Sequence, residues 1–281
     1  MPSLAFRIVN VFTRDQGVLT GNPLCVFENG AGIDTGTMQA LARQFNLSET
    51  TFILPSETAT AKVRIFTPSY EMPFAGHPTL GTSHVCRILG LGNDDLHLEM
   101  KAGIIPVTAR ANRWSLQAKA PVWRNVEVPN ATLAALLRID AAAIAAAPLW
   151  ISTGKEQLLV QLDSTETVRR VQPDSSQFAE MASADGQLLV YVFAANGPNR
   201  MLARAFFASG STVLEDPATG SAAANLGGWM LATERRLPLS CEISQGEQVG
   251  RPSTLFLDVD DGGKIHVAGE VIELARGTLQ L

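Results

Sequence analysis

The chain has 281 residues, of which 46% are hydrophobic and 17% are charged, and its formal net charge is -5. This length allows one large domain or two modest ones, and the composition is that of a globular protein rather than a disordered chain. Because there is no excess of Lys and Arg to neutralise phosphates, we expect neither a nucleic-acid partner nor a membrane partner.

The sequence also carries no feature of export or membrane insertion. In the N-terminal segment Arg7 and Asn10 interrupt the apolar stretch, which is not the pattern of a secretory signal. No stretch approaches the roughly 18 apolar residues that cross a bilayer. Cys25, Cys86 and Cys241 lie far apart, which favours reduced thiols over a disulfide framework or a zinc site. We therefore expect a cytoplasmic protein.

Short β-rich runs alternate with helical patterns along the chain. Runs of Val, Ile, Phe and Leu bounded by turn residues predict strands at Phe6–Phe12, Leu24–Glu28, Thr51–Leu54, Ala61–Phe66, Leu96–Met100, Trp114–Gln117, Leu158–Leu162, Leu188–Phe193, Met201–Phe207, Leu255–Val259 and Ile265–Ala268. Helices are predicted at Thr35–Phe45, Pro78–Leu89, Leu133–Leu137, Ala141–Ala146 and Gly220–Thr233. The first of these helices is amphipathic, and Asp34 or Thr35 can cap its free amides.

The sequence repeats itself weakly across its middle. The segment from Glu71 to His77, EMPFAGH, and the segment from Glu215 to Ser221, EDPATGS, share the pattern E-x-P-x-x-G followed by a polar residue. An apolar strand is predicted before each copy and a helix after it. This shared context favours an internal duplication over a chance match.

The two halves are expected to meet near Pro121–Pro129, where no periodic element is obvious. This predicts an N-terminal half of residues 1–122, which holds Glu49 and His77. The C-terminal half, residues 123–281, holds Asp216 and Ser221, and its last strand can pack back on the first half.

Each repeat ends where a helix begins, with Gly76 and His77 in one copy and Gly220 and Ser221 in the other. A helix start presents unpaired backbone amides and the positive end of the helix dipole, so it binds a carboxylate well. If the halves face each other, the two helix starts converge on one cleft. The alternative is that the glycines only allow tight turns and Ser221 is a plain N-cap.

Three side chains near these loops suit proton transfer. His77 precedes a proline fitted to a first helical turn, and His is the side chain matched to proton traffic near neutral pH. Asp216 corresponds to Met72 in the other copy, so the two loops differ chemically, as a proton-transfer site requires. The alternative is that Asp216 only caps its own turn. Glu49 lies between a helix and a strand, where a carboxylate can act as a general base or can simply be solvated.

Other catalytic signatures are missing from the sequence. There is no dinucleotide-binding glycine fingerprint, no phosphate-binding loop and no nucleophile elbow. The four histidines are scattered and lie near no cysteine pair, so no metal is predicted.

Taken together, these motifs resemble the PhzF-like phenazine-biosynthesis family, whose fold is that of diaminopimelate epimerase. The resemblance is carried, in family order, by VFT at 11–13, GNP at 21–23, NLSET at 46–50, FAGHPT at 74–79, EDPATGSA at 215–222, QG at 245–246 and RPS at 251–253. It therefore covers nearly the whole chain.

The resemblance implies an α/β fold of two pseudo-symmetric halves. Each half would be a mostly antiparallel sheet wrapped around a central helix, with the active site in the cleft between them. It also implies a homodimer that acts on a small-molecule substrate without a cofactor.

The family's characterised activity is the isomerisation of trans-2,3-dihydro-3-hydroxyanthranilate, in which a Glu carries the proton. That role would fall on Glu49, and His77 and Asp216 match the other catalytic positions. The substrate-binding positions that it matches are Gly76, Thr219, Gly220 and Ser221.

Two other functions stay open on the same scaffold. One is a racemase or epimerase of an amino or hydroxy acid, although relatives of that kind use two cysteines and neither repeat loop contains one. The other is a small-molecule binding protein that performs no chemistry.

Overall fold

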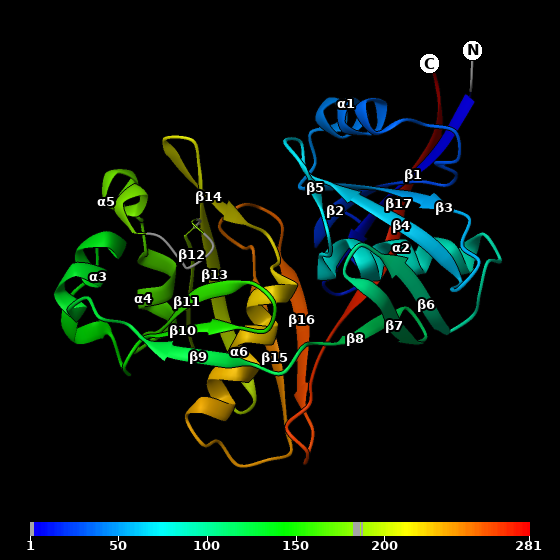
Figure 1. Ribbon diagram of the computed structural model, residues 1–281. Coiled ribbons are helices and arrows are strands. Elements are labelled where there is room, and N and C mark those ends of the chain that lie inside the picture. The colour runs from blue at the N-terminus through cyan, green and yellow to red at the C-terminus, as the bar shows by residue number, and fades with distance from the viewer. Residues whose placement is uncertain (1–2, 182–185, 187) are drawn as a thin grey trace. The chain divides into compact units, whose positions relative to one another are not determined.

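The computed structural model describes residues 3–181, 186 and 188–281. Contacts within the chain divide it into two units (Figure 1). Unit 1 comprises Met1–Gln117 and Ala268–Leu281, and unit 2 comprises Ala118–Val267. The C-terminal residues thus return to the unit that contains the N-terminus.

Unit 1 contains a closed circuit of strands. Its elements are β1 (Ser3–Val11), β2 (Asn22–Phe27), α1 (Thr35–Phe45), β3 (Glu49–Leu54), β4 (Ala61–Phe66), β5 (Glu71–Met72), α2 (Gly76–Ile88), β6 (Asp95–Met100), β7 (Gly103–Arg110), β8 (Arg113–Gln117) and most of β17 (Ile265–Gln280). Strand pairing runs β4–β3–β2–β1–β17–β8–β7–β6, and β6 pairs with β4 again. The pairs β2–β3 and β4–β6 are parallel, and the pairs β3–β4, β1–β2, β1–β17, β7–β8 and β6–β7 are antiparallel.

Helix α2 lies inside this circuit. It contacts β1, β2, β3, β4, β6 and β8, and every residue from His77 to Cys86 is buried. Such close packing requires a small residue at one position. A Cβ atom on Gly81 would lie 2.6 Å from Leu24 and 2.9 Å from Val11, so only glycine lets the helix approach β1 and β2 this closely.

Helix α1 covers the outer face of the same strands. Asp34 caps it by accepting a hydrogen bond from the Thr37 amide, and Asn46 ends it in the left-handed conformation, with φ of 51°. Its apolar face joins a cluster with residues of β1–β4, made of Leu4, Cys25, Phe27, Met38, Leu41, Ala42, Phe52 and Phe66. Strands β2 and β3 are therefore buried on both faces.

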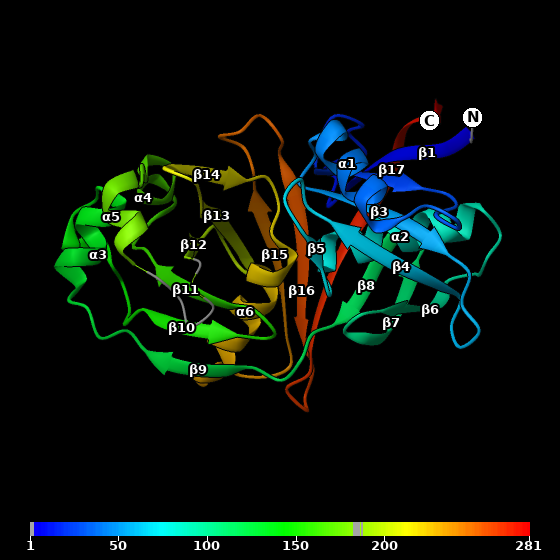
Figure 2. The same ribbon diagram turned by 45° about the horizontal axis from the view of Figure 1, so that its top comes forward.

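Unit 2 repeats this construction. Its elements are β9 (Val122–Asn125), α3 (Asn130–Leu137), the 3₁₀ turn η1 (Ala141–Ala143), β10 (Leu149–Ser152), β11 (Glu156–Gln161), α4 (Thr165–Arg170), α5 (Ser175–Glu180), β12 (Leu189–Ala195), β13 (Arg200–Ser209), β14 (Thr212–Asp216), α6 (Gly220–Ala232), β15 (Leu239–Gln245) and β16 (Ser253–Val259). Helix α6 contacts β9, β10, β11 and β16, as Figure 2 shows from a second direction. A Cβ atom on Gly227 would lie 2.9 Å from Ile265, so glycine again permits the close packing.

The second face of the unit 2 sheet packs against α3, α4 and α5. A cluster of buried apolar side chains joins these helices to β11, β12 and β13, and includes Leu133, Leu137, Leu158, Val160, Val168, Phe178, Val190, Val192 and Leu202. The sheet of unit 2 is thus covered on both sides, with α6 on one face.

The order of strand pairing confirms the internal duplication. In unit 1, β1–β2 is antiparallel, β2–β3 parallel, β3–β4 and β4–β5 antiparallel, and β4–β6 parallel. In unit 2 the same sequence of pairings joins β10, β11, β12, β13, β14 and β15. The two E-x-P-x-x-G segments lie at equivalent places, between β5 and α2 and between β14 and α6. The predicted fold class is therefore confirmed for each unit.

The structure also explains the shared glutamate of the repeat. Glu71 on β5 pairs with Arg64 on β4, and Glu215 on β14 pairs with Arg204 on β13. Each arginine also stacks over a phenylalanine two residues later, at 5.0 Å for Phe66 and 4.7 Å for Phe206. The repeat glutamates thus each tie together a pair of neighbouring strands.

Several elements differ from the sequence-based expectations. The segment Ala141–Ala146 was expected to be a helix, but only a 3₁₀ turn at Ala141–Ala143 forms there, and Ile144 makes an isolated bridge to Leu162. The stretch Pro121–Pro129 was expected to lack an element, but it contains β9, which pairs with β10. The strands β5, β7, β10, β14, β15 and most of β17, and the helices α4 and α5, were also not predicted.

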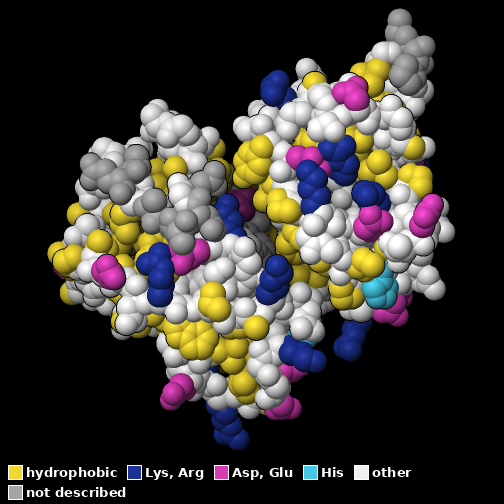
Figure 3. Space-filling model, viewed as in Figure 1, with side chains coloured by type: hydrophobic (Ala, Val, Ile, Leu, Met, Phe, Trp, Pro, Cys, Tyr) yellow, Lys and Arg dark blue, Asp and Glu magenta, His cyan; other side chains and the backbone are white. Residues whose placement is uncertain are grey.

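No helix among the described residues is long and apolar enough to cross a membrane. On the face drawn in Figure 3, Lys and Arg side chains are interspersed with Asp and Glu side chains. All three cysteines are buried and free, as their spacing in the sequence predicts.

A buried histidine gives unit 1 a predicted sensitivity to acid. His84 on α2 accepts a hydrogen bond from the Trp114 indole at 3.3 Å, and burial lowers the pKa of His84 to about 4. An unfolded chain takes up this proton near pH 6.5, so stability is lost as pH falls through the interval between these values. We expect the free energy of unfolding of wild type to fall by about 2–3 kcal/mol more than that of His84→Gln over this interval. Urea unfolding of both proteins at pH 7 and pH 4.5 measures this difference. An equal fall in the free energy of unfolding in both proteins would contradict the role given to His84.

Candidate active site

The sequence-predicted residues Glu49 and His77 meet in unit 1. Glu49 is the first residue of β3, and His77 lies in the first turn of α2. The Nδ1 atom of His77 lies 2.9 Å from Oε2 of Glu49, and the two side chains are 7% and 18% exposed. A carboxylate paired with an imidazole at hydrogen-bonding distance can take up and return a proton.

The elements that carry this pair are tied together beside it. Side chains alternate along β3, so Glu49 and Thr51 face α2 while Thr50 and Phe52 face the opposite way. The hydroxyl of Thr51 lies 2.8 Å from that of Thr82 on α2, and both residues are buried. This second contact holds β3 and α2 in fixed register and so fixes the Glu49–His77 distance.

The second ring nitrogen of His77 is buried and has no hydrogen-bond partner among the described residues. An ionised Glu49 only accepts hydrogen bonds, so Nδ1 of a neutral His77 carries the hydrogen and Nε2 is left as an acceptor. An unpaired polar atom of this kind is costly to bury, and a substrate or a water can satisfy it. The pair therefore offers two proton-accepting atoms, one on each residue.

Phe12 forms an apolar wall beside the histidine. Its ring centroid lies 6.5 Å from that of His77, and its backbone is in the left-handed region with φ of 63°. A Cβ atom on Gly269 would lie 2.2 Å from the Phe12 ring, so the ring rests directly on the backbone of β17. A left-handed phenylalanine is unusual, and such strain is typical of functional sites.

In unit 2 the predicted Asp216 ends β14, just before α6. Thr219 donates a hydrogen bond from its hydroxyl to Oδ2 of Asp216 at 2.6 Å. The buried Gln245 accepts from the Thr219 amide at 3.3 Å and donates to the Asp216 carbonyl at 2.9 Å. Burial raises the pKa of Tyr191, so its hydroxyl stays protonated and donates to Gln245. The carboxylate is thus held in one orientation by its own loop.

Ser221 is the partly exposed residue in the first turn of an otherwise buried helix α6. Its hydroxyl oxygen accepts a hydrogen bond from Nε2 of Gln157 at 2.8 Å. Gln157 in turn accepts from the Asn225 amide at 2.9 Å. Both amide side chains are fully buried, so the serine is tied to the interior of unit 2.

The two helix starts have no side-chain cap. No side chain caps α2 at Ala75 or α6 at Thr219, although Asp34 caps α1 and Ser164 caps α4. The amides at Gly76 and Gly220 are left to other partners, and an anion is a suitable one.

The structure thus joins Glu49 to His77 within unit 1 and Asp216 to Thr219 within unit 2. That all of them share one cleft stays a prediction. Sequence reasoning assigned no role to Gln157, Asn225 or Gln245. A signal was available only at Asn225, a single amide residue within a run of apolar and small residues, since burial of such a group demands specific partners.

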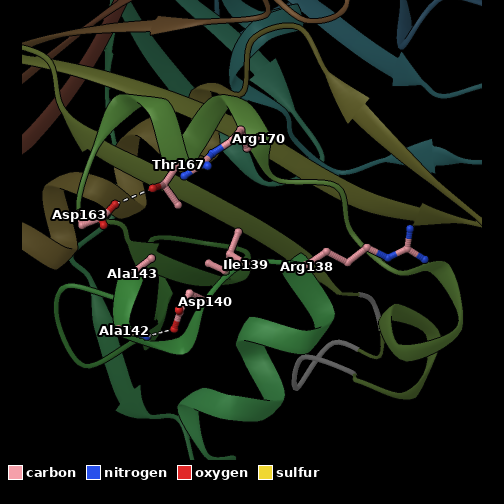
Figure 4. Close-up of a pocket in the computed structure, with 8 residues that line it drawn as sticks. All are labelled: Arg138, Ile139, Asp140, Ala142, Ala143, Asp163, Thr167 and Arg170. Carbon is pink, nitrogen blue, oxygen red and sulfur yellow. Dashed lines mark hydrogen bonds between the residues drawn. The ribbon is translucent and has the colours of Figure 1, made fainter.

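Among the described residues, no group of three or more His, Cys, Asp or Glu side chains is placed to hold a metal ion. A cavity of about 410 Å³ lies in unit 2, lined by Arg138, Ile139, Asp140, Ala142, Ala143, Asp163, Thr167 and Arg170 (Figure 4). Its polar side chains serve local structure: Asp140 caps η1, and Asp163 accepts from Thr167 at 2.6 Å. Arg138 reaches away from the other lining residues to pair with Asp174. The predicted site residues do not line this cavity.

Comparison with known proteins places the chain among enzymes. The family model of phenazine biosynthesis-like proteins matches residues 9–277. An uncharacterized isomerase of Pasteurella multocida is 39% identical, over 98% of this chain and 93% of that protein. The trans-2,3-dihydro-3-hydroxyanthranilate isomerase of Pseudomonas aeruginosa is 33% identical, over 98% of this chain and 99% of that protein. A crystal structure of a PhzF-family phenazine biosynthesis protein of Bacillus anthracis superposes with a TM-score of 0.87 at 22% identity and covers 100% of both chains.

Proposed function

Because the chain belongs to the family of phenazine biosynthesis-like proteins, we propose that it is an isomerase in which Glu49 moves a proton on a small carboxylate-bearing substrate without a cofactor. The observation that carries this proposal is the Glu49–His77 pair, nearly enclosed and 2.9 Å apart. Glu49 is the more exposed member of the pair, so it is the one that a substrate can reach.

In the proposed reaction the Glu49 carboxylate removes a proton from an activated carbon. It then returns this proton at another position of the same conjugated system, so that the reaction moves double bonds without oxidation or reduction. His77 supports the step because its contact with Oε2, at 2.9 Å, holds the Glu49 carboxylate in one orientation for the transfer. The apolar wall at Phe12 excludes water, which keeps the proton on the carrier.

Residues of unit 2 are assigned to binding and assistance. Asp216 has a fixed carboxylate that can orient a polar substituent of the substrate, and Ser221 has a hydroxyl that can hold a carboxylate. The uncapped amides at Gly76 and Gly220 would steady negative charge that develops during the transfer.

The substrate class follows from the relatives. The Pseudomonas aeruginosa relative is named for its action on trans-2,3-dihydro-3-hydroxyanthranilate, a cyclic diene that carries a carboxylate and an amino group. We propose a substrate of this kind for the present chain, since a conjugated ring carboxylate offers both an acidic C–H and an anion to bind.

A two-thiol racemase mechanism finds no support in the structure. Such a mechanism needs a thiolate on one side of a substrate carbon, to remove the proton, and a thiol on the other side, to supply one. Burial raises the pKa of Cys86 and of Cys241 to about 12, and it raises the pKa of the Cys25 thiol as well. These thiols stay protonated near neutral pH and are enclosed in the core.

Proton exchange in deuterium oxide tests the proposal. The enzyme is incubated with trans-2,3-dihydro-3-hydroxyanthranilate, and the C–H signals are followed by NMR. We expect isomerisation with little deuterium at the carbon that receives the proton, because Glu49 returns the proton that it removed and water is excluded from it. A substrate that binds but shows neither exchange nor isomerisation would contradict the proposal and would favour a binding protein.

A further inference from the structure

The hydrogen-bond directions around Ser221 are fixed by backbone groups, whose roles as donors or acceptors are known. Nδ2 of Asn225 lies 3.0 Å from the carbonyl oxygens of both Ile151 and Lys155, and a carbonyl only accepts. Oδ1 of Asn225 lies 2.8 Å from the backbone nitrogen of Thr153, which only donates. The amide of Asn225 therefore has one possible orientation.

This orientation determines that of the next amide. Asn225 presents its Nδ2 to Gln157 at 2.9 Å, so the atom of Gln157 that faces it is the oxygen. The Nε2 atom of Gln157 must then face Ser221, to which it donates at 2.8 Å. Gln157 has no exposed surface, so no rearrangement toward solvent competes with this geometry.

The consequence falls on the Ser221 hydroxyl. Its oxygen accepts from Gln157, and its own hydrogen has no acceptor within the part of the chain that the structure describes. Ser221 is partly exposed at the start of α6, and the adjacent helix amides are donors as well. The Ser221 hydroxyl and the uncapped amide of Gly220 thus both offer a hydrogen at this point.

We propose that Gln157 and Asn225 are positioning residues that fix Ser221 as a hydrogen-bond donor. The site then selects, at this point, a substrate group that only accepts hydrogen bonds, for which an ionised carboxylate is the best match. This inference rests on the proposed function, in which Ser221 holds the substrate carboxylate.

Two substitutions at Gln157 separate this role from simple packing. Gln157→Met keeps the length of the side chain and removes the donor, and Asn225 keeps its two carbonyl acceptors. Gln157→Glu introduces an acceptor, which turns the Ser221 hydrogen inward and adds a charge that repels a carboxylate. The probe is 3-hydroxyanthranilate, an aromatic carboxylate that cannot undergo the isomerisation, and its Kd is measured by calorimetry.

We expect Kd to rise about 2–10-fold in Gln157→Met, the range of one hydrogen bond, and more than about tenfold in Gln157→Glu at pH 8. The Gln157→Glu effect should shrink as pH falls to 5.5, because the introduced carboxyl then becomes protonated and can donate to Ser221 again. In a Ser221→Ala background, Gln157→Met should have no effect on Kd, since Gln157 acts through the serine.

Three results would overturn the inference. The first is a wild-type protein that does not bind the probe. The second is a rise in Kd that is equal in both Gln157 variants and independent of pH. The third is a rise in Kd caused by Gln157→Met that is as large in the Ser221→Ala background as in wild type. Turnover of trans-2,3-dihydro-3-hydroxyanthranilate is assayed separately. Wild type that binds the probe in the expected pattern but shows no turnover contradicts only the proposed function.

Discussion

Glu49→Gln is expected to lower kcat by at least about a thousandfold, since positioned general acid–base groups contribute roughly 10²–10⁴-fold and this residue is assigned both proton removal and return. Glutamine has the same shape and can still accept from His77 Nδ1, so the site should keep its geometry. Binding of 3-hydroxyanthranilate should therefore change by less than about threefold, which is below the effect of one hydrogen bond to a charged group.

The measurement combines NMR-detected turnover with calorimetric binding, and Glu99→Gln serves as the matched control. Glu99 is a partly exposed glutamate of unit 1 whose carboxylate pairs with Lys62 at 2.8 Å, and it has no role in the proposed reaction. Its substitution should leave kcat unchanged. If Glu49→Gln retains near-normal kcat, Glu49 is not the proton carrier. His77, whose Nε2 is the second proton-accepting atom of the pair, would then be the residue to examine.

The sequence specified several helices well because local rules determine them. Gly220 and the helix that follows it were predicted, as was the helix over Thr35–Phe45, which has its cap at Asp34 and its left-handed end at Asn46. Glu49 and His77 were both identified from the sequence. That they touch was not predicted, because the contact depends on β3 packing against α2.

Elements whose stability comes from pairing were harder to predict. β7 is mostly exposed and has a proline, Pro106, within its apolar residues, and β9 is exposed along its whole length, so neither has the pattern of a buried strand. β17 was expected to end at Ala268 but continues to Gln280, because its later residues pair with β1 from the opposite end of the sequence. Such long-range pairing leaves little trace in local composition.

The buried amides were missed for a related reason. Gln157 and Asn225 form hydrogen bonds that stretch across 64 and 72 residues of sequence to Ser221 and Thr153. Gln245 similarly reaches back to Asp216. A single polar residue in an apolar run indicates that a partner exists, but only the fold identifies which one.

The partners of the two paired arginines could also not be identified from the sequence. Substitution of one of them, Arg204, has the largest expected effect on stability. Arg204 and Glu215 have side chains that are each only 8% exposed, and Nη1 of Arg204 also donates to the carbonyls of Val168, Arg169 and Val171. Arg204→Met keeps much of the volume but leaves a buried carboxylate and these carbonyls without their donor. We expect the free energy of unfolding to fall by about 3–5 kcal/mol, as measured by urea unfolding at pH 7.

The equivalent pair of unit 1 provides the control. Arg64 and Glu71 are 19% and 12% exposed, and Lys101 lies 2.7 Å from Glu71 as a second cation. Arg64→Met should therefore cost only about 1–2 kcal/mol, since the carboxylate keeps a partner. Removing both charges in Arg204→Met/Glu215→Leu should restore part of the loss, because the main penalty is the unpaired buried charge. Equal losses in the two arginine variants, with no recovery in the double variant, would mean that packing against Phe206 and Phe66 rather than charge determines the cost. Because Glu215 directly precedes Asp216, the same ion pair also anchors the strand end that carries the proposed site residue.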